Sequence, residues 1–283
     1  MRHNGGNGMR KRDAEPRVAP VKEQLIIAFP QFADLIEQTP VHLISKRTIA
    51  RRNQIADELE ADAKSNFSDT AAEAFVGKNG YAVILYYEHI HERDFEHFLF
   101  HEFGHVISIH VNKDLFDEAQ RDIARDNDTA IRIGASVWCE FIAEAIAYIA
   151  EDGDPTGDIF AINWKLERLI GEAVNGGYLE PYPLAFYLAM MFTDPTIEAY
   201  LQTHPNAALG LNDCDDEVIP YIEELLLVLN EQTKKDDYYV IERETLMELG
   251  ARLDDLWGYC ADLHNAKMLR AALERLSKEQ PLS

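Results

Sequence analysis

The chain has few cysteines, and those it has are poorly placed for cross-linking. Only three of the 283 residues are cysteine, namely Cys139, Cys214 and Cys260, and they lie far apart in the sequence. An odd number of widely spaced cysteines gives neither a disulfide framework nor a C-x-x-C metal pair. Because structural disulfides are rare in reducing compartments, the scarcity favours a cytoplasmic location.

Positive charge is also scarce. The 27 basic residues are outnumbered by 50 acidic ones, which gives a formal net charge of −23. Such a surface repels phosphate, so we expect no nucleic-acid partner and no anionic membrane surface as a partner. No run of about 18 apolar residues is apparent, and we therefore expect no transmembrane helix. Residues 1–20 are basic, contain three glycines and lack the apolar middle of a secretory signal, which predicts a disordered tail.

Against this background one short motif stands out: His101-Glu102-Phe103-Gly104-His105, an H-E-x-x-H sequence. Two histidines four residues apart on a helix project from one face and can bind the same metal ion. Zn²⁺ suits imidazole ligands. Glu102 is turned about 100° around the helix axis from His101, where its carboxylate can lean toward a metal-bound water. The motif therefore predicts metal-assisted hydrolysis with Glu102 as the general base.

An accidental match is the alternative, because histidines are frequent in this stretch. The context favours the metal site, since apolar residues recur at helical spacing from about Glu92 to Val111. Gly104 costs such a helix about 1 kcal/mol relative to alanine, so we expect a packing or access reason for it. His97, one turn before His101, is expected to line the cleft, and His110 to be a surface or packing residue.

Zinc needs a third protein ligand, and the best candidate lies on a later helix. In Trp138-Cys139-Glu140-Phe141-Ile142-Ala143-Glu144, the two glutamates share one face of an otherwise apolar segment. Buried carboxylates are costly unless something positive meets them, and a metal with a ligating histidine provides that compensation. We assign Glu140 as the third ligand and Glu144 as the carboxylate that orients His101 or His105. Reversed roles, or a merely exposed acidic stripe, remain open alternatives.

Together these residues resemble a known family of enzymes. H-E-F-G-H followed by Glu140-Phe141-Ile142-Ala143-Glu144 resembles the gluzincin pattern, and the strand and two helices look most like ImmA/IrrE-type metallopeptidases. The likeness covers about Ala71 to Ala150. It implies His101, His105 and Glu140 as metal ligands and Glu102 as the catalytic base. The implied function is a zinc metallopeptidase that hydrolyses a peptide or protein substrate. A donor for the developing oxyanion is also required, and Tyr178, Tyr182 and His204 are the candidates.

The predicted fold is a predominantly helical α+β protein with a small antiparallel hairpin. Residues 71–76 and 81–87 have strand composition and flank Gly77-Lys78-Asn79-Gly80, whose Asn-Gly pair is typical of a tight turn. The second strand directly precedes the H-E-x-x-H helix, and its free edge could pair with a peptide substrate. Other helices are expected over residues 21–36 (interrupted at Pro30), 45–64, 129–151, 163–175, 182–192, 194–203, 215–231, 242–260 and 262–278. We expect a catalytic domain over 21–204 and a C-terminal helical region over 205–283.

Two other functions are consistent with the same residues. One is a carboxylate-bridged di-iron protein that uses Glu102, His105, Glu140 and Glu144. Such sites require a second helix that carries E-x-x-H. The only other copy, Glu88-His89-Ile90-His91, closely follows a strand. The other is a non-enzymatic helical interaction or regulatory protein with a vestigial or structural metal site.

Overall fold

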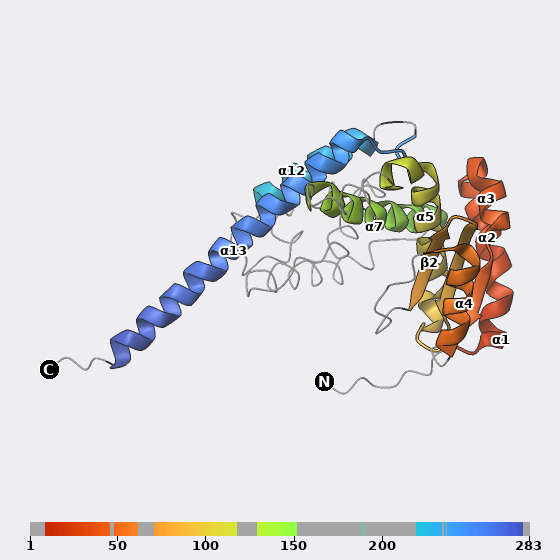
Figure 1. The fold of residues 1–283 in the computed structure, drawn as a ribbon, viewed down its shortest axis with the longest axis horizontal. Helices are drawn as coiled ribbons and strands as arrows, with labels where there is room; N and C mark the ends of the chain where they lie inside the picture. Colours follow the sequence, from red (N-terminus) through yellow and green to blue (C-terminus); the bar gives the residue numbers. More distant parts are fainter. Residues whose placement is uncertain are drawn as a thin grey trace. The chain divides into compact units, whose positions relative to one another are not determined.

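The computed structural model describes residues 9–45, 48–61, 71–117, 129–151, 189, 219–233, 235 and 237–279. As predicted, the fold is mostly helical with a small sheet (Figure 1). The chain forms two compact units, one comprising Met1–Lys113 and Ile142–Asp154, the other Asp114–Phe141 and Pro155–Ser283. The predicted domain boundary at residues 204 and 205 lies outside the described residues.

The sheet has three strands: β1 (Val41–Ile44), β2 (Ala72–Gly77) and β3 (Gly80–Tyr86), in the order β1-β3-β2. The predicted hairpin is confirmed, because β2 and β3 pair antiparallel with Gly77 opposite Gly80. Gly80 has φ of +130°, a conformation that side chains rarely allow. β1 was not predicted and pairs parallel with β3. The expectation that β3 has a free edge is therefore wrong, since both of its edges are already paired.

Helices cover both faces of this sheet. Helix α4 (Ile49–Leu59) packs on one face, where Ile55 and Ala56 join a core cluster with strand residues of all three strands, namely Ile44, Phe75, Ala82, Ile84 and Tyr86. Helix α5 (Phe95–Val111) packs against β2 and β3. Strand residues alternate between the faces, so Val83 and Leu85 point away from the α4 cluster, and both are fully buried. The prediction of a helix carrying H-E-x-x-H is confirmed, and a 3-10 turn at Glu92–Asp94 precedes it.

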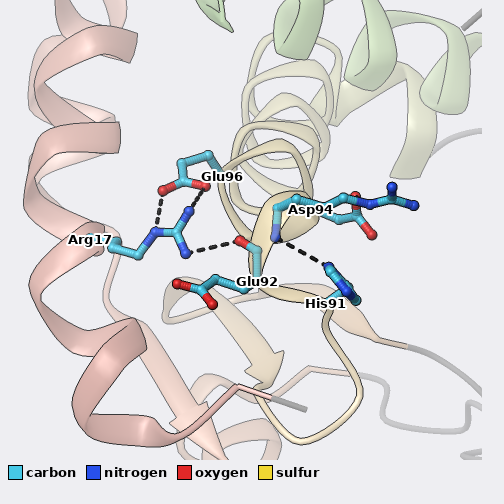
Figure 2. A network of polar contacts seen from close by, with 6 residues as sticks. Arg17, His91, Glu92, Asp94 and Glu96 are labelled. Atoms are coloured by element: carbon cyan, nitrogen blue, oxygen red, sulfur yellow. Dashed lines mark hydrogen bonds and ion pairs between the residues drawn. The ribbon is translucent and has the colours of Figure 1, made fainter. Parts of the chain in front are cut away.

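The N-terminal segment folds rather than forming a tail. Helix α1 (Lys11–Ala14), a 3-10 turn (Glu15–Arg17), α2 (Val18–Ala28) and α3 (Ala33–Gln38) follow one another, so the prediction of disorder is wrong for residues 11–20. Figure 2 shows one reason: the Arg17 guanidinium pairs with the Glu96 carboxylate and donates to the Glu92 carbonyl oxygen at 2.9 Å. In the same view, the Nδ1 atom of His91 accepts a bond from the backbone N–H of Arg93. One of the basic residues that suggested a tail, Arg17, is thus the ion-pair partner of Glu96 in the first turn of α5.

The second unit contains the first part of α7 (Thr129–Glu151) together with α12 (Ile219–Thr233) and α13 (Arg243–Glu279). Helices α7 and α13 cross at two glycines. A Cβ atom on Gly134 would lie 1.9 Å from the Leu246 carbonyl oxygen, and one on Gly250 would lie 1.7 Å from the Ala130 carbonyl oxygen. Each glycine therefore makes room for the backbone of the other helix.

The predicted bounds of α7 are confirmed, and α12 lies close to its predicted range. The prediction of two helices over 242–260 and 262–278 is wrong, because α13 is continuous. No glycine or proline interrupts the junction, so nothing local ends the helix there. The predicted helix over 45–64 is shorter, spanning Ile49–Leu59 in the described part. The predicted helices over 163–175, 182–192 and 194–203 lie outside the described residues, apart from residue 189.

One described helix is long and apolar enough to cross a membrane by length and composition alone. It is Ala130–Glu151 within α7, and the sequence expectation of no transmembrane helix stays a prediction, because length and composition alone do not test it. Of its most apolar window, 61% is buried inside the structure. Burial of this kind is also what the core helix of a folded domain shows.

Candidate metal site

Helix α5 brings the two histidines of the motif together. His101 and His105 lie one turn apart, and their Nε2 atoms are 3.0 Å from each other. The two ring planes are nearly perpendicular, at 88°. His101 is only 6% exposed, whereas His105 is half-buried. Two ring nitrogens therefore converge on one point, which lies at the boundary between the core and a more accessible region.

Glu144 on α7 contacts the other nitrogen of the His101 ring. Its Oε1 atom is 3.1 Å from His101 Nδ1, and its side chain is fully buried. An ionised carboxylate can only accept a hydrogen bond, so this contact favours the proton on Nδ1. The tautomer that results has a lone pair on Nε2, the atom that faces His105. Carboxylate contacts of this type are the usual partners of metal-ligating histidines.

Glu140 lies one turn before Glu144 on the same helix. Ligand atoms of His101, His105 and Glu140 all lie within 4.8 Å of one another, and among the described residues this is the group that could hold a metal ion. Glu140, like His105, is half-buried. Two nitrogens and one carboxylate oxygen form a donor set typical of catalytic zinc, with one coordination position left for water or substrate. The three residues predicted as ligands are thus together in space.

Glu102, the predicted general base, is only 6% exposed. It follows His101 directly in the helix, so its side chain starts beside the histidine pair.

Close packing against α7 explains why a glycine stands at position 104 within the helix. A Cβ atom there would lie 2.5 Å from the Cα atom and 2.8 Å from the carbonyl oxygen of Ala143 on α7. Only glycine lets the two backbones come this close. Because Ala143 directly precedes Glu144, the same close approach brings the carboxylate within reach of His101.

Two more residues extend the cluster and were missed as partners at the sequence level. The Nε2 atom of His97 is 3.2 Å from Glu144 Oε2, and its Nδ1 atom is 3.1 Å from Glu151 Oε2. The expectation for His97 was a residue lining the cleft, and its ring instead lies between two carboxylates of α7. The signal was present, because His97, His101 and His105 recur every four residues, and Glu151 lies two turns beyond Glu144 on the same face.

The charges in this cluster shift the pKa values of Glu144 and His97. Burial alone would raise the pKa of Glu144, but the adjacent His101 and His97 hold it well below its usual range. Burial alone would lower the pKa of His97, but hydrogen bonds and charge from Glu144 and Glu151 raise it to about 9. The cluster is therefore a chain of alternating imidazole and carboxylate groups in which the Glu144 carboxylate stays ionised.

The other residues considered at the sequence level either lie outside the described residues or lie elsewhere in the structure. Tyr178, Tyr182 and His204, the candidate oxyanion donors, lie outside the described residues. His110 lies at the exposed end of α5, where its Nδ1 atom is 2.9 Å from the Tyr81 hydroxyl, in line with a surface or packing role. Glu88 of the second E-x-x-H copy accepts a hydrogen bond from the Ser45 hydroxyl at 2.7 Å.

Comparison with known proteins adds no relative: neither a family model, nor a curated protein, nor a solved structure matches this chain. The residues and their geometry are therefore the basis for assigning a function.

Proposed function

We propose that the protein is a zinc-dependent peptidase of the gluzincin type, similar to the ImmA/IrrE family. The observation that carries the proposal is the convergence of His101, His105 and Glu140, whose ligand atoms lie within 4.8 Å of one another. The buried contact between Glu144 and the far side of the His101 ring supports it. A surface acidic stripe, the alternative for the two glutamates, does not account for a carboxylate with no exposed side-chain area.

The spacing of the donors fits the size of the ion. Two nitrogens at about 2.0–2.1 Å from a tetrahedral zinc are about 3.3 Å apart. The Nε2 atoms of His101 and His105 are 3.0 Å apart, so a small outward movement of either ring is sufficient. A bound Zn²⁺ ion would supply Lewis acidity, which polarises a carbonyl group and makes a nearby water more acidic.

The protein's own residues then handle the protons. Glu102 accepts a proton from the attacking water and passes it to the amine that leaves when the peptide bond breaks. The Nε2 atoms of His101 and His105 face one point, and Glu144 contacts the other nitrogen of the His101 ring and holds that ring in its orientation. His105 and Glu140 are half-buried, so both keep some exposure to solvent, and we expect the substrate to approach the site past them.

A peptide substrate pairing with the sheet would use an outer strand. Among the described strands β3 is paired on both sides, which leaves the outer edges of β1 and β2 as the positions at which an extended chain could add. Of these, β2 packs directly against α5. We propose β2 as the strand that carries the substrate, and a cytoplasmic peptide or protein as the substrate class.

The experiment is metal analysis combined with a cleavage assay. Wild-type protein should contain one zinc per chain by mass spectrometry, and Glu140→Ala should lose it. Glu248→Ala, which changes an exposed glutamate on α13 in a surface pair with Arg252, is the matched control and should keep it. Glu102→Gln should keep zinc but lose cleavage of a peptide library. Zinc-free wild-type protein, or full turnover by Glu102→Gln, would contradict the proposal.

The same measurements separate the two alternatives. A di-iron protein would contain two irons per chain. A structural or vestigial site would contain one zinc in wild-type protein and cleave no peptide, with Glu102→Gln indistinguishable from wild type in every assay.

A further inference from the structure

The His97 ring lies between two acidic side chains at the edge of the core that supports the proposed metal site. Its Nε2 atom faces Glu144 Oε2 at 3.2 Å, and its Nδ1 atom faces Glu151 Oε2 at 3.1 Å. The Nδ1 contact has the geometry of a hydrogen bond to Glu151, and the Nε2 contact is an ion pair with Glu144 when the ring is protonated. The geometry is that of an imidazolium bridging two carboxylates.

The ring is also held by packing. Its centroid lies 5.7 Å from that of Tyr148, which belongs to α7, and 6.4 Å from that of Phe98. The His97 side chain is 23% exposed and that of Glu151 is 25% exposed, whereas Glu144 is completely buried. The chain of contacts therefore runs inward from a partly exposed glutamate, through His97, to the buried carboxylate beside His101.

Glu144 needs this second partner. Each of its oxygens faces one histidine, Oε1 toward His101 and Oε2 toward His97. Without His97, the Oε2 atom would lose its contact with that ring, and the carboxylate would be held less firmly in its orientation toward His101.

We propose that His97 is a positioning residue for the metal site: bridged between Glu144 and Glu151, it fixes the carboxylate that orients His101. This inference rests on the proposed function, because it assumes that His101 ligates a metal. The raised pKa of His97 supports it, since the protonated ring persists at neutral pH. Glu151 acts one step further out, by keeping the His97 ring charged and correctly rotated.

The test is cobalt binding, because Co²⁺ in a zinc site gives a visible spectrum that reports ligand geometry. Purified metal-free protein is titrated with Co²⁺, comparing wild type, His97→Gln and Glu151→Gln. His110→Gln is the matched control, since it removes an exposed histidine from the same helix. We expect His97→Gln to bind Co²⁺ about 10- to 100-fold more weakly, the usual loss for an orienting partner, and to show an altered spectrum at saturation. Glu151→Gln should show a smaller loss, and His110→Gln none.

The outcomes separate this inference from the proposed function. Wild-type protein that binds no Co²⁺ would overturn both. Normal Co²⁺ binding by wild type together with unchanged affinity in His97→Gln and Glu151→Gln would overturn only the role of His97. A loss of affinity with a wild-type spectrum at saturation would also overturn it, because general destabilisation has that effect. If His97→Gln does not fold, Glu151→Gln decides alone, since it removes a partly exposed charge.

Discussion

Substituting alanine for Gly104 tests whether the close approach of α5 and α7 builds the site. The added Cβ atom would lie 2.5 Å from Ala143 Cα, while carbon atoms in contact are normally about 3.5–4.0 Å apart. The two helices must therefore separate by about 1 Å or distort. Overpacking of this kind costs about 1–3 kcal/mol, and the helix propensity of alanine returns at most about 1 kcal/mol.

The movement matters more for the metal than for the fold. Metal–ligand distances in zinc sites vary by only about 0.2 Å, so a shift of α7 by about 1 Å moves Glu140 and Glu144 out of position. We expect Gly104→Ala to weaken zinc binding at least 10-fold. We also expect faster hydrogen exchange in α5 and the last turns of α7, equivalent to about 1–2 kcal/mol of lost local stability.

Gly258→Ala provides the matched control. This glycine also lies within a helix, but a Cβ atom there meets nothing within 4 Å. The same substitution should slow exchange in α13, stabilising it by about 0.5–1 kcal/mol, and leave zinc binding unchanged. Hydrogen exchange measured by mass spectrometry reads both helices in one experiment. Unchanged protection of α5 and wild-type zinc affinity in Gly104→Ala would refute the packing explanation for this glycine.

Further predictions concern stability. With a folded pKa of about 9 against about 6.5 unfolded, His97 stabilises the fold fully below about pH 6.5 and loses that contribution as the pH rises through 9. In metal-free protein, urea unfolding should show a loss of about 2 kcal/mol between about pH 7 and pH 9.5 that is missing in His97→Gln; parallel curves would contradict it. Arg52, 3% exposed and paired with Glu73, should cost about 3–5 kcal/mol when changed to alanine, and Arg52→Met with Glu73→Gln, which keeps an acceptor for the buried Tyr86 hydroxyl, should recover part of it. Equal unfolding midpoints for the single and double variants would count against a buried charge effect. Gly250→Ala, whose Cβ would lie 1.7 Å from the Ala130 carbonyl oxygen, should speed exchange at the start of both α7 and α13, and protected amides there would exclude that crossing.

Local signals were enough to predict several elements of the fold. The Asn-Gly pair placed the β2–β3 hairpin, and helical periodicity placed α5 and α7, because both patterns depend on residues close in sequence. The pairing of β1 with β3 joins Val41 to Val83 across a long stretch of chain, which no local pattern reports. Residues 11–20 are held in part by the ion pair of Arg17 with Glu96, another contact between distant segments.

The candidate site was predictable for a similar reason. His101, Glu102 and His105 follow from one helical motif, and Glu140 with Glu144 from an acidic pair on an apolar helix. The tertiary pairing was harder, since the sequence does not say which histidine meets which glutamate. His97 shows the difference: its spacing from His101 was visible, but its position between Glu144 and Glu151 requires knowing how α5 and α7 are aligned.

That alignment is itself constrained by the polar residues. Sliding α7 along α5 by one helical turn, about 5.4 Å, would move Glu144 away from both rings and leave a negative charge facing apolar side chains. The alternating carboxylate and imidazole groups thus favour one alignment of the two helices over others that hydrophobic contacts alone would allow. A chain that reaches its native helix alignment has, in the same event, assembled the donor atoms for a cation.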